Sequence, residues 1–132
     1  MYLVYHPEGS EEPRVFEYKP SKMLSAEREV LEKRTGRTYE QAHQRILEGG
    51  SVERRALLWL FLKRDNARLR YEDVEFAWDE LTVEFSKQEW AEMREKVEGV
   101  LSGDELSQAL AAIDDEMETA REEGKALAKS DG

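Results

Sequence analysis

SVERRALLWLFLKRD, residues 51–65, contains the only sustained apolar run of this 132-residue chain, whose mean hydropathy is −0.79. Its centre consists of seven apolar residues, Ala56–Leu62, far fewer than the roughly 20 that cross a bilayer. Leucine and alanine favour a helix, and the run lacks β-branched residues. Ser51 can cap the helix N-terminus, and Lys63 and Arg64 suit the partial negative charge of the last turn. We therefore predict a helix that is apolar on nearly all sides and is surrounded by the rest of the fold, or partly by a partner.

Around this helix, local signals predict a mainly α protein, a small helical domain of about five to six helices with an N-terminal β-hairpin. Two short stretches rich in aromatic and β-branched residues, with a turn-forming segment between them, indicate the hairpin. Thr38 with Gln41 has the pattern of a capping box, and Gly36 is placed to end a helix. The predicted elements are strands over 2–5 and 14–18 and helices over 26–34, 39–48, 52–65, 72–85, 87–98 and 103–123.

Serine residues mark three further helix starts. Ser25 is placed to cap the helix over 26–34, because its hydroxyl can accept a hydrogen bond from a free backbone N–H two or three residues later. Ser86 and Ser102 are each followed, three residues later, by a glutamate. Both pairs therefore have the pattern of a capping box.

Residues 72–85 satisfy two patterns at once. Val74, Leu81 and Phe85 fit the spacing of a helix, whereas Leu81, Val83 and Phe85 also alternate, so the end of the segment can be extended. We expect one domain with four parts: the hairpin over 1–20, a helical core over 21–85, an acidic helical part over 86–123 and a flexible tail over 124–132.

The charge of the chain is strongly negative and unevenly distributed. A net charge of −10 and a pI of about 4.8 argue against a general nucleic-acid binder, which needs surplus Lys and Arg, but leave a DNA mimic open. The segments 53–70, 72–89 and 104–123 carry +4, −6 and −7. This pattern suggests internal pairing or head-to-tail self-association; the alternative is solvated faces, whose exposed ion pairs contribute little.

The sequence contains no recognisable arrangement of catalytic or metal-binding residues. There are no cysteines, which excludes disulfides and cysteine-based metal sites. The two histidines, His6 and His43, lack metal-ligand spacing, and the acidic clusters lack the alternation of a calcium loop. We therefore predict a non-enzymatic protein with no metal or cofactor. No signal peptide or membrane span is recognisable, which favours a cytoplasmic location.

The last predicted helix carries a narrow apolar seam. Leu106, Leu110, Ile113, Met117 and Ala120 are spaced four, three, four and three residues apart, which is the heptad spacing of a helix that packs on another helix. Two interpretations stay open. The helix lies along the edge of its own domain, or it grips a helix from a second copy of the chain or from a client.

Four short motifs in the central region resemble a known family. They are EKRTGRTY at Glu32–Tyr39, GGS at Gly49–Ser51, ALLW at Ala56–Trp59 and RYEDV at Arg70–Val74. Together they resemble the small tail assembly chaperones of long-tailed (siphovirus-type) bacteriophages, over residues 14–85. The acidic helices after Ser86 add no motif of that family.

The resemblance implies a protein of the host cytoplasm that coats the long helical tape-measure protein, helps recruit tail-tube subunits and leaves before the virion is complete. A helix-in-groove contact would cover apolar stretches of such a client. Genes of this family often shift reading frame near their 3′ end. Glu123-Gly124-Lys125 can be encoded GAG-GGA-AAG, which contains a slippery run, and the nucleotide sequence of codons 122–126 tests this expectation.

We place the client on the central helix and on the seam of the last helix. Leu58 to Leu62 would form the wall of a groove, and basic residues at both ends of the helix would form its rim and steer an acidic partner. The alternative for each apolar residue is plain core. Replacing Arg54 and Arg55 by glutamate should then weaken client binding without unfolding the protein. The candidate partner-binding residues are Arg54, Arg55, Leu58, Trp59, Leu62, Lys63, Arg64, Leu106, Leu110, Ile113 and Met117.

Three rival functions differ from a chaperone in class. The acidic helices are compatible with an inhibitor that mimics DNA, although the basic central stretch argues against a uniformly acidic face. A structural connector at the head–tail junction or tail tip would stay in the particle, where mass spectrometry would detect it. A helical adaptor or regulator is the third, and the sequence offers nothing diagnostic of it.

Overall fold

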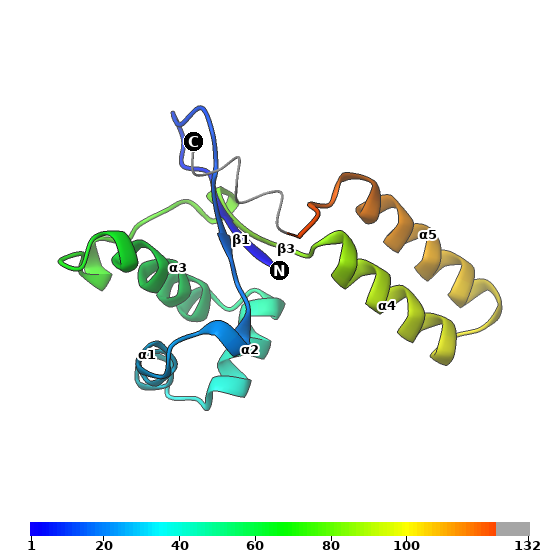
Figure 1. Ribbon diagram of the computed structural model, residues 1–132, viewed down its shortest axis with the longest axis horizontal. Helices are drawn as coiled ribbons and strands as arrows, with labels where there is room; N and C mark the ends of the chain where they lie inside the picture. Colours follow the sequence, from blue (N-terminus) through cyan, green and yellow to red (C-terminus); the bar gives the residue numbers. More distant parts are fainter. Residues whose placement is uncertain (124–132) are drawn as a thin grey trace.

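The computed structural model describes residues 1–123, which form a mainly α-helical protein with a small antiparallel sheet at its N-terminus (Figure 1). This confirms the predicted fold class. The strands are β1 (Tyr2–Tyr5), β2 (Arg14–Glu17) and β3 (Leu81–Glu84), and the helices are α1 (Ser25–Thr35), α2 (Tyr39–Glu48), α3 (Ser51–Asp65), α4 (Lys87–Val100) and α5 (Gly103–Thr119), with 3-10 turns over Pro20–Lys22, Tyr71–Asp73 and Trp78–Glu80.

Helix α3 is the centre of the core. Six consecutive residues, Ala56 to Phe61, are buried, because α1 and α2 pack on α3 and the sheet covers it from another side. The ring of Phe16 in β2 stacks on the ring of Phe61, with the centroids 5.4 Å apart. Leu3 of β1 belongs to the same core cluster and is fully buried. The predicted helix that is apolar on nearly all sides is therefore enclosed by its own chain.

The sheet has three strands in the order β2-β1-β3, one more than the predicted hairpin. Leu3 is paired with Phe16 on one side and with Val83 on the other, and these residues share the face that packs on the core. The residues that alternate with Leu3 point to the opposite face, where Tyr2 and Val4 form a separate buried cluster with Val15.

The helix predicted over 72–85 is wrong, and only the extended reading of its end holds. The segment contains two 3-10 turns followed by β3. Its backbone is held by side chains of α3: Arg55 Nε donates to the Val74 carbonyl at 2.7 Å, and Trp59 Nε1 donates to the Leu69 carbonyl just before the segment at 3.0 Å. Strand β1 then offers a free edge to Leu81–Glu84. These tertiary partners outweigh the local helical spacing.

Some of the capping predictions are confirmed and others are wrong, depending on whether the side chain forms a hydrogen bond to the helix N-terminus. Thr38 accepts from the Gln41 N–H at 3.2 Å and Ser86 accepts from the Glu89 N–H at 3.1 Å, which confirms both boxes. Gly36 ends α1 with φ +67°, as predicted. Ser25 and Ser51 are wrong as caps, because each is the first residue inside its helix, and Ser102 stands at the cap of α5 without a side-chain bond.

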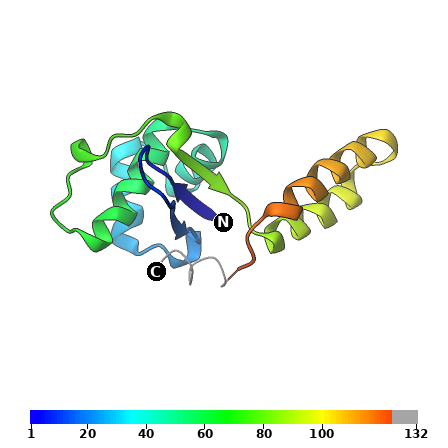
Figure 2. The same ribbon diagram turned by 90° about the horizontal axis from the view of Figure 1, so that it is seen from above.

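Helices α4 and α5 form an antiparallel hairpin that projects from the rest of the protein, as Figures 1 and 2 show. We call residues 1–85 the body and residues 87–119 the arm. Helix α5 ends at Thr119, not near residue 123 as predicted, because the chain turns back toward the body there. The Lys87 N–H donates to the Arg121 carbonyl at 2.8 Å. The predicted flexible tail over 124–132, and Gly124 and Lys125 of the frameshift motif, lie outside the described residues.

Candidate partner-binding surface

The apolar residues predicted to wall a client groove lie inside the body. Leu58 is fully buried, Trp59, Leu60 and Phe61 are 7%, 5% and 2% exposed, and Leu62 is half-buried. The indole N–H of Trp59 is used to hold the Leu69 carbonyl. A client cannot reach this wall in the folded protein, because the sheet, α1 and the loop after α3 already occupy it. These residues form the core, which is the alternative interpretation of the sequence.

The two arginines at the start of α3 are structural ties. Arg54 donates through Nε to the Ile46 carbonyl at 2.8 Å. Arg55 donates to the Val74 and Tyr71 carbonyls, and its guanidinium lies 4.5 Å from the centre of the Tyr71 ring. Their half-buried side chains hold the chain on either side of α3. The expectation that Arg54 and Arg55 can be replaced by glutamate without harm to the fold is therefore corrected.

The basic residues at the end of α3 also have partners in the body. Arg64 contacts both carboxylate oxygens of Glu27 in α1, at 2.7 and 2.8 Å. This hydrogen bonding holds the pKa of the Glu27 carboxyl below its usual range, against the opposing effect of burial. The Lys63 ammonium lies 4.8 Å from the centre of the Trp59 ring. Lys63 and Arg64 are thus engaged by partners within the body, although the Arg64 side chain is 43% exposed.

The predicted seam of α5 packs on α4, so the arm provides its own helical partner. Of the five seam residues, only Ile113 is buried, at 8% exposed; Leu106, Leu110, Met117 and Ala120 are half-buried, and Ala120 lies just after the end of α5. Helix α4 contributes a matching row, which is also half-buried. Two helices alone leave both sides of a seam in contact with water. The apolar residues of this row are Trp90, Met93 and Val97.

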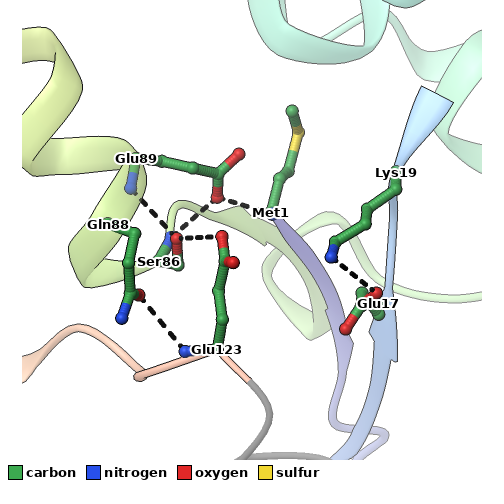
Figure 3. Close-up of polar contacts among 7 residues, drawn as sticks. All are labelled: Met1, Glu17, Lys19, Ser86, Gln88, Glu89 and Glu123. Atoms are coloured by element: carbon green, nitrogen blue, oxygen red, sulfur yellow. Dashed lines mark hydrogen bonds and ion pairs between the residues drawn. The ribbon is translucent and has the colours of Figure 1, made fainter. Parts of the chain in front are cut away.

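A compact set of polar contacts joins the arm to the body, as Figure 3 shows. Ser86, which is fully buried, caps α4 and donates its hydroxyl to Glu123 Oε1 at 3.0 Å. The amino group of Met1 lies 2.5 Å from Glu89 Oε1. Gln88 Oε1 accepts from the Glu123 N–H at 3.2 Å. The first turn of α4 and the chain after α5 are thereby tied to one another and to β1.

The arm is the most acidic part of the described chain. It carries ten acidic side chains against three basic ones, a net charge of −7. Glu89 pairs with the Met1 amino group, and Arg94 pairs with Asp114 and Glu98. Within residues 1–123, the remaining seven have no ion-pair partner. They are Glu92, Glu95, Asp104, Glu105, Asp115, Glu116 and Glu118.

The body holds one buried polar chain that the sequence does not predict. The Tyr18 hydroxyl lies 2.7 Å from the Tyr39 hydroxyl and 2.8 Å from His43 Nδ1. Burial raises the pKa of the Tyr18 hydroxyl and lowers the pKa of the His43 imidazole, because desolvation penalises both charged forms. A neutral His43 can accept from Tyr18 while Tyr18 accepts from Tyr39. This arrangement ties Tyr18, just after β2, to α2.

The described residues show no assembled metal site and no membrane span. Between residues 1 and 123, no group of three or more His, Asp or Glu side chains is placed to hold a metal ion. No helix in that range has the length and apolarity needed to cross a bilayer.

The arm is a surface open to a partner, and the sequence predicted only its α5 half. Leu106, Leu110, Ile113 and Met117 were recognised as a seam, but α4 was not recognised as its partner. The sequence did contain an indication of this packing. The link at Leu101–Ser102 is so short that it favours packing of the two helices it joins against each other.

Comparison with known proteins adds no relative. No protein-family model, curated protein or solved structure matches this chain.

Proposed function

We propose that the protein is a non-enzymatic tail assembly chaperone of a long-tailed bacteriophage, which binds the helical tape-measure protein in the host cytoplasm, keeps it soluble and helps recruit tail-tube subunits. The motifs between residues 14 and 85 supply the family resemblance. The observation that carries the binding role is the arm, a two-helix hairpin that projects from a body with an enclosed core and keeps its apolar seam half covered.

The proposal divides the work between the two parts of the molecule. The body buries a continuous apolar cluster around α3 and serves as a stable support. The arm offers half-covered apolar side chains together with seven carboxylates that have no ion-pair partner among the described residues. A tape-measure helix would be stabilised if its apolar stretches were buried against such a surface. The negative charge would keep the complex soluble and away from host nucleic acid.

Co-expression tests this function. The chain, with an affinity tag, is produced together with the long helix-rich polypeptide encoded next to it, and the soluble fraction of that polypeptide is measured. We expect the client to become soluble and to co-purify with the tagged chain. A client that stays insoluble and is not retained contradicts the proposal. Detection of this chain in purified particles by mass spectrometry would instead identify a structural connector.

A DNA-mimic inhibitor is the second candidate, because the arm carries a net charge of −7. Competition with duplex DNA for a host DNA-binding protein tests it. The exposed apolar side chain of Val100, at 80%, favours a polypeptide client over a site for a phosphate-binding protein.

A further inference from the structure

The two sides of the arm differ. The ion pair between Arg94 of α4 and Asp114 of α5 spans the two helices and marks one side, where Glu98 also joins it. Because each residue of an α-helix is turned by about 100° from the previous one, the residues on the other flank of each seam can be identified. On α4 this side carries Val100 together with Met93 and Val97, the two seam residues that are turned toward it. On α5 it carries Glu105, Ala109, Ala112 and Glu116.

These seven residues form what we call the open face. The α4 members are spaced four and three residues apart, and the α5 members four, three and four, so each set is a single row along its helix. Because the two helices run antiparallel, the same rotation away from each seam leads to the same side of the arm. Both rows therefore lie on the side opposite the Arg94–Asp114 pair. The open face is therefore a continuous strip along the outer part of the arm.

The open face has the composition of a helix-docking surface. Val100 is 80% exposed, the highest value among the exposed large hydrophobic residues of the described chain, while Met93 and Val97 are half-buried. Opposite them, the row on α5 presents Ala109 and Ala112. Small side chains allow a third helix to approach closely, because interaxial distance depends on the side chains at the contact.

The charge around the open face selects the partner. Glu105 and Glu116 stand at its α5 edge, and neither has an ion-pair partner among residues 1–123. A second copy of the arm would bring a charge of −7 against −7, which opposes association. A helix with Lys or Arg beside its apolar stripe would satisfy the carboxylates and cover the aliphatic side chains together.

We propose that the open face binds one amphipathic helix of the client, with basic residues flanking its apolar stripe, as the third helix of a bundle. The inference rests on the proposed chaperone function and specifies the chemistry of the client segment. It also gives the acidic charge of the arm a role in choosing the segment, because Lys or Arg at the α5 edge would meet Glu105 and Glu116.

A matched pair of variants tests the open face directly. Ala112→Glu places a carboxylate on the side of the open face, whereas Ala111→Glu adds the same charge at the adjacent exposed position, on the side of α5 that carries Asp114. The probe is a synthetic Leu/Lys/Ala helix of about 18 residues, or five turns, and its Leu/Glu/Ala counterpart is the charge control. Binding to the full chain is measured by calorimetry, and circular dichroism checks that both variants keep the helix content of the original protein.

We expect the basic peptide to bind the original protein and Ala111→Glu alike, and Ala112→Glu about tenfold or more weakly. Val100→Glu, a change at an exposed side chain, should give the same loss. The Leu/Glu/Ala peptide should not bind. Equal affinity of Ala111→Glu and Ala112→Glu would overturn the inference, because attraction to general negative charge would then explain all the binding.

The same variants separate this inference from the function on which it rests. If the original protein fails to retain the tape-measure client in co-expression, the chaperone function fails, whatever the peptide result. If the client is retained equally by Ala111→Glu and Ala112→Glu, the chaperone function stands and the open face is not its docking site. Loss of the client with Ala112→Glu alone supports both.

Discussion

At the residue scale, the charged side chains around α3 serve the fold. Arg55 is the clearest case, because one guanidinium holds two carbonyls of the loop after α3 and lies over the Tyr71 ring. Arg64 likewise ties α3 to α1, by donating to the carboxylate of Glu27. A basic residue beside an apolar helix therefore does not identify a binding rim unless its donors are free.

Arg55→Ala should lower the free energy of unfolding by about 1–3 kcal/mol, because the Val74 carbonyl would lose its donor. Arg68→Ala is the matched control, since Arg68 is exposed and makes its hydrogen bond through its backbone N–H. Urea unfolding followed by circular dichroism measures both. Equal stability of the two variants would show that the loop does not depend on Arg55.

Two glycines without positive φ should respond in opposite ways to alanine. Gly99 lies inside α4 with nothing within 4 Å of an added Cβ, so Gly99→Ala should stabilise the protein by about 0.5–1 kcal/mol. At Gly50 the added Cβ would clash with Glu53 Oε1 and would lie 3.1 Å from the Arg45 carbonyl oxygen. Glu53 is 4% exposed and has little room to move, so Gly50→Ala should destabilise. Thermal unfolding of both variants tests the contrast, and a rise in melting temperature for Gly50→Ala would refute it.

At the element scale, the arm depends on its first turn. Ser86, two residues after the end of β3, caps α4 and binds Glu123, so one hydroxyl links the first turn of α4 to the chain that returns from α5. The corresponding serine of α5, Ser102, stands at the helix cap without a side-chain bond. Both serines have the same capping-box pattern in the sequence, but only the Ser86 side chain forms hydrogen bonds.

Ser86→Ala should cost about 0.5–2 kcal/mol, the usual effect of losing a helix cap. Ser102→Ala should be close to neutral. Hydrogen exchange of the amides at Gln88 and Glu89 gives the local readout, because an uncapped first turn opens more often. If exchange at these amides is unchanged in Ser86→Ala, the cap is not what holds the arm at its base.

At the scale of the whole molecule, body and arm have different means of stability. The body buries a continuous cluster around α3, whereas Ile113 is the only residue of the arm helices that is buried. The arm therefore depends on its junction with the body and, in our proposal, on a third helix. We attribute binding to the arm for this reason, and stability to the body.

Stability should fall on mild acidification through His43. Burial lowers the pKa of its imidazole below the ordinary 6.5, so the unfolded chain takes up a proton at higher pH than the folded chain. The free energy of unfolding is therefore lost as the pH falls through about 6.5 and below. Glu27, whose pKa is lowered from 4.5, adds its own loss only in more acidic solution.

His43→Gln separates the two effects, because glutamine can accept from Tyr18 and does not titrate. Urea unfolding at about pH 7.5 and 5.5 should show a clear loss for the original protein and a smaller one for the variant. Parallel losses in both proteins would show that His43 does not report on folding.

The sequence by itself determined two helix caps and the central helix, which depend on neighbours within about four residues. Thr38 with Gln41 and Ser86 with Glu89 predicted their caps, and the apolar run predicted an enclosed helix. Tertiary structure alone decided the course of residues 71–84, because the donors that hold this loop come from α3 and the strand edge comes from β1. It also decided that the basic residues of α3 have partners within the body. These features depend on contacts with residues distant in the sequence, and the local spacing of residues does not show which distant residues will make those contacts.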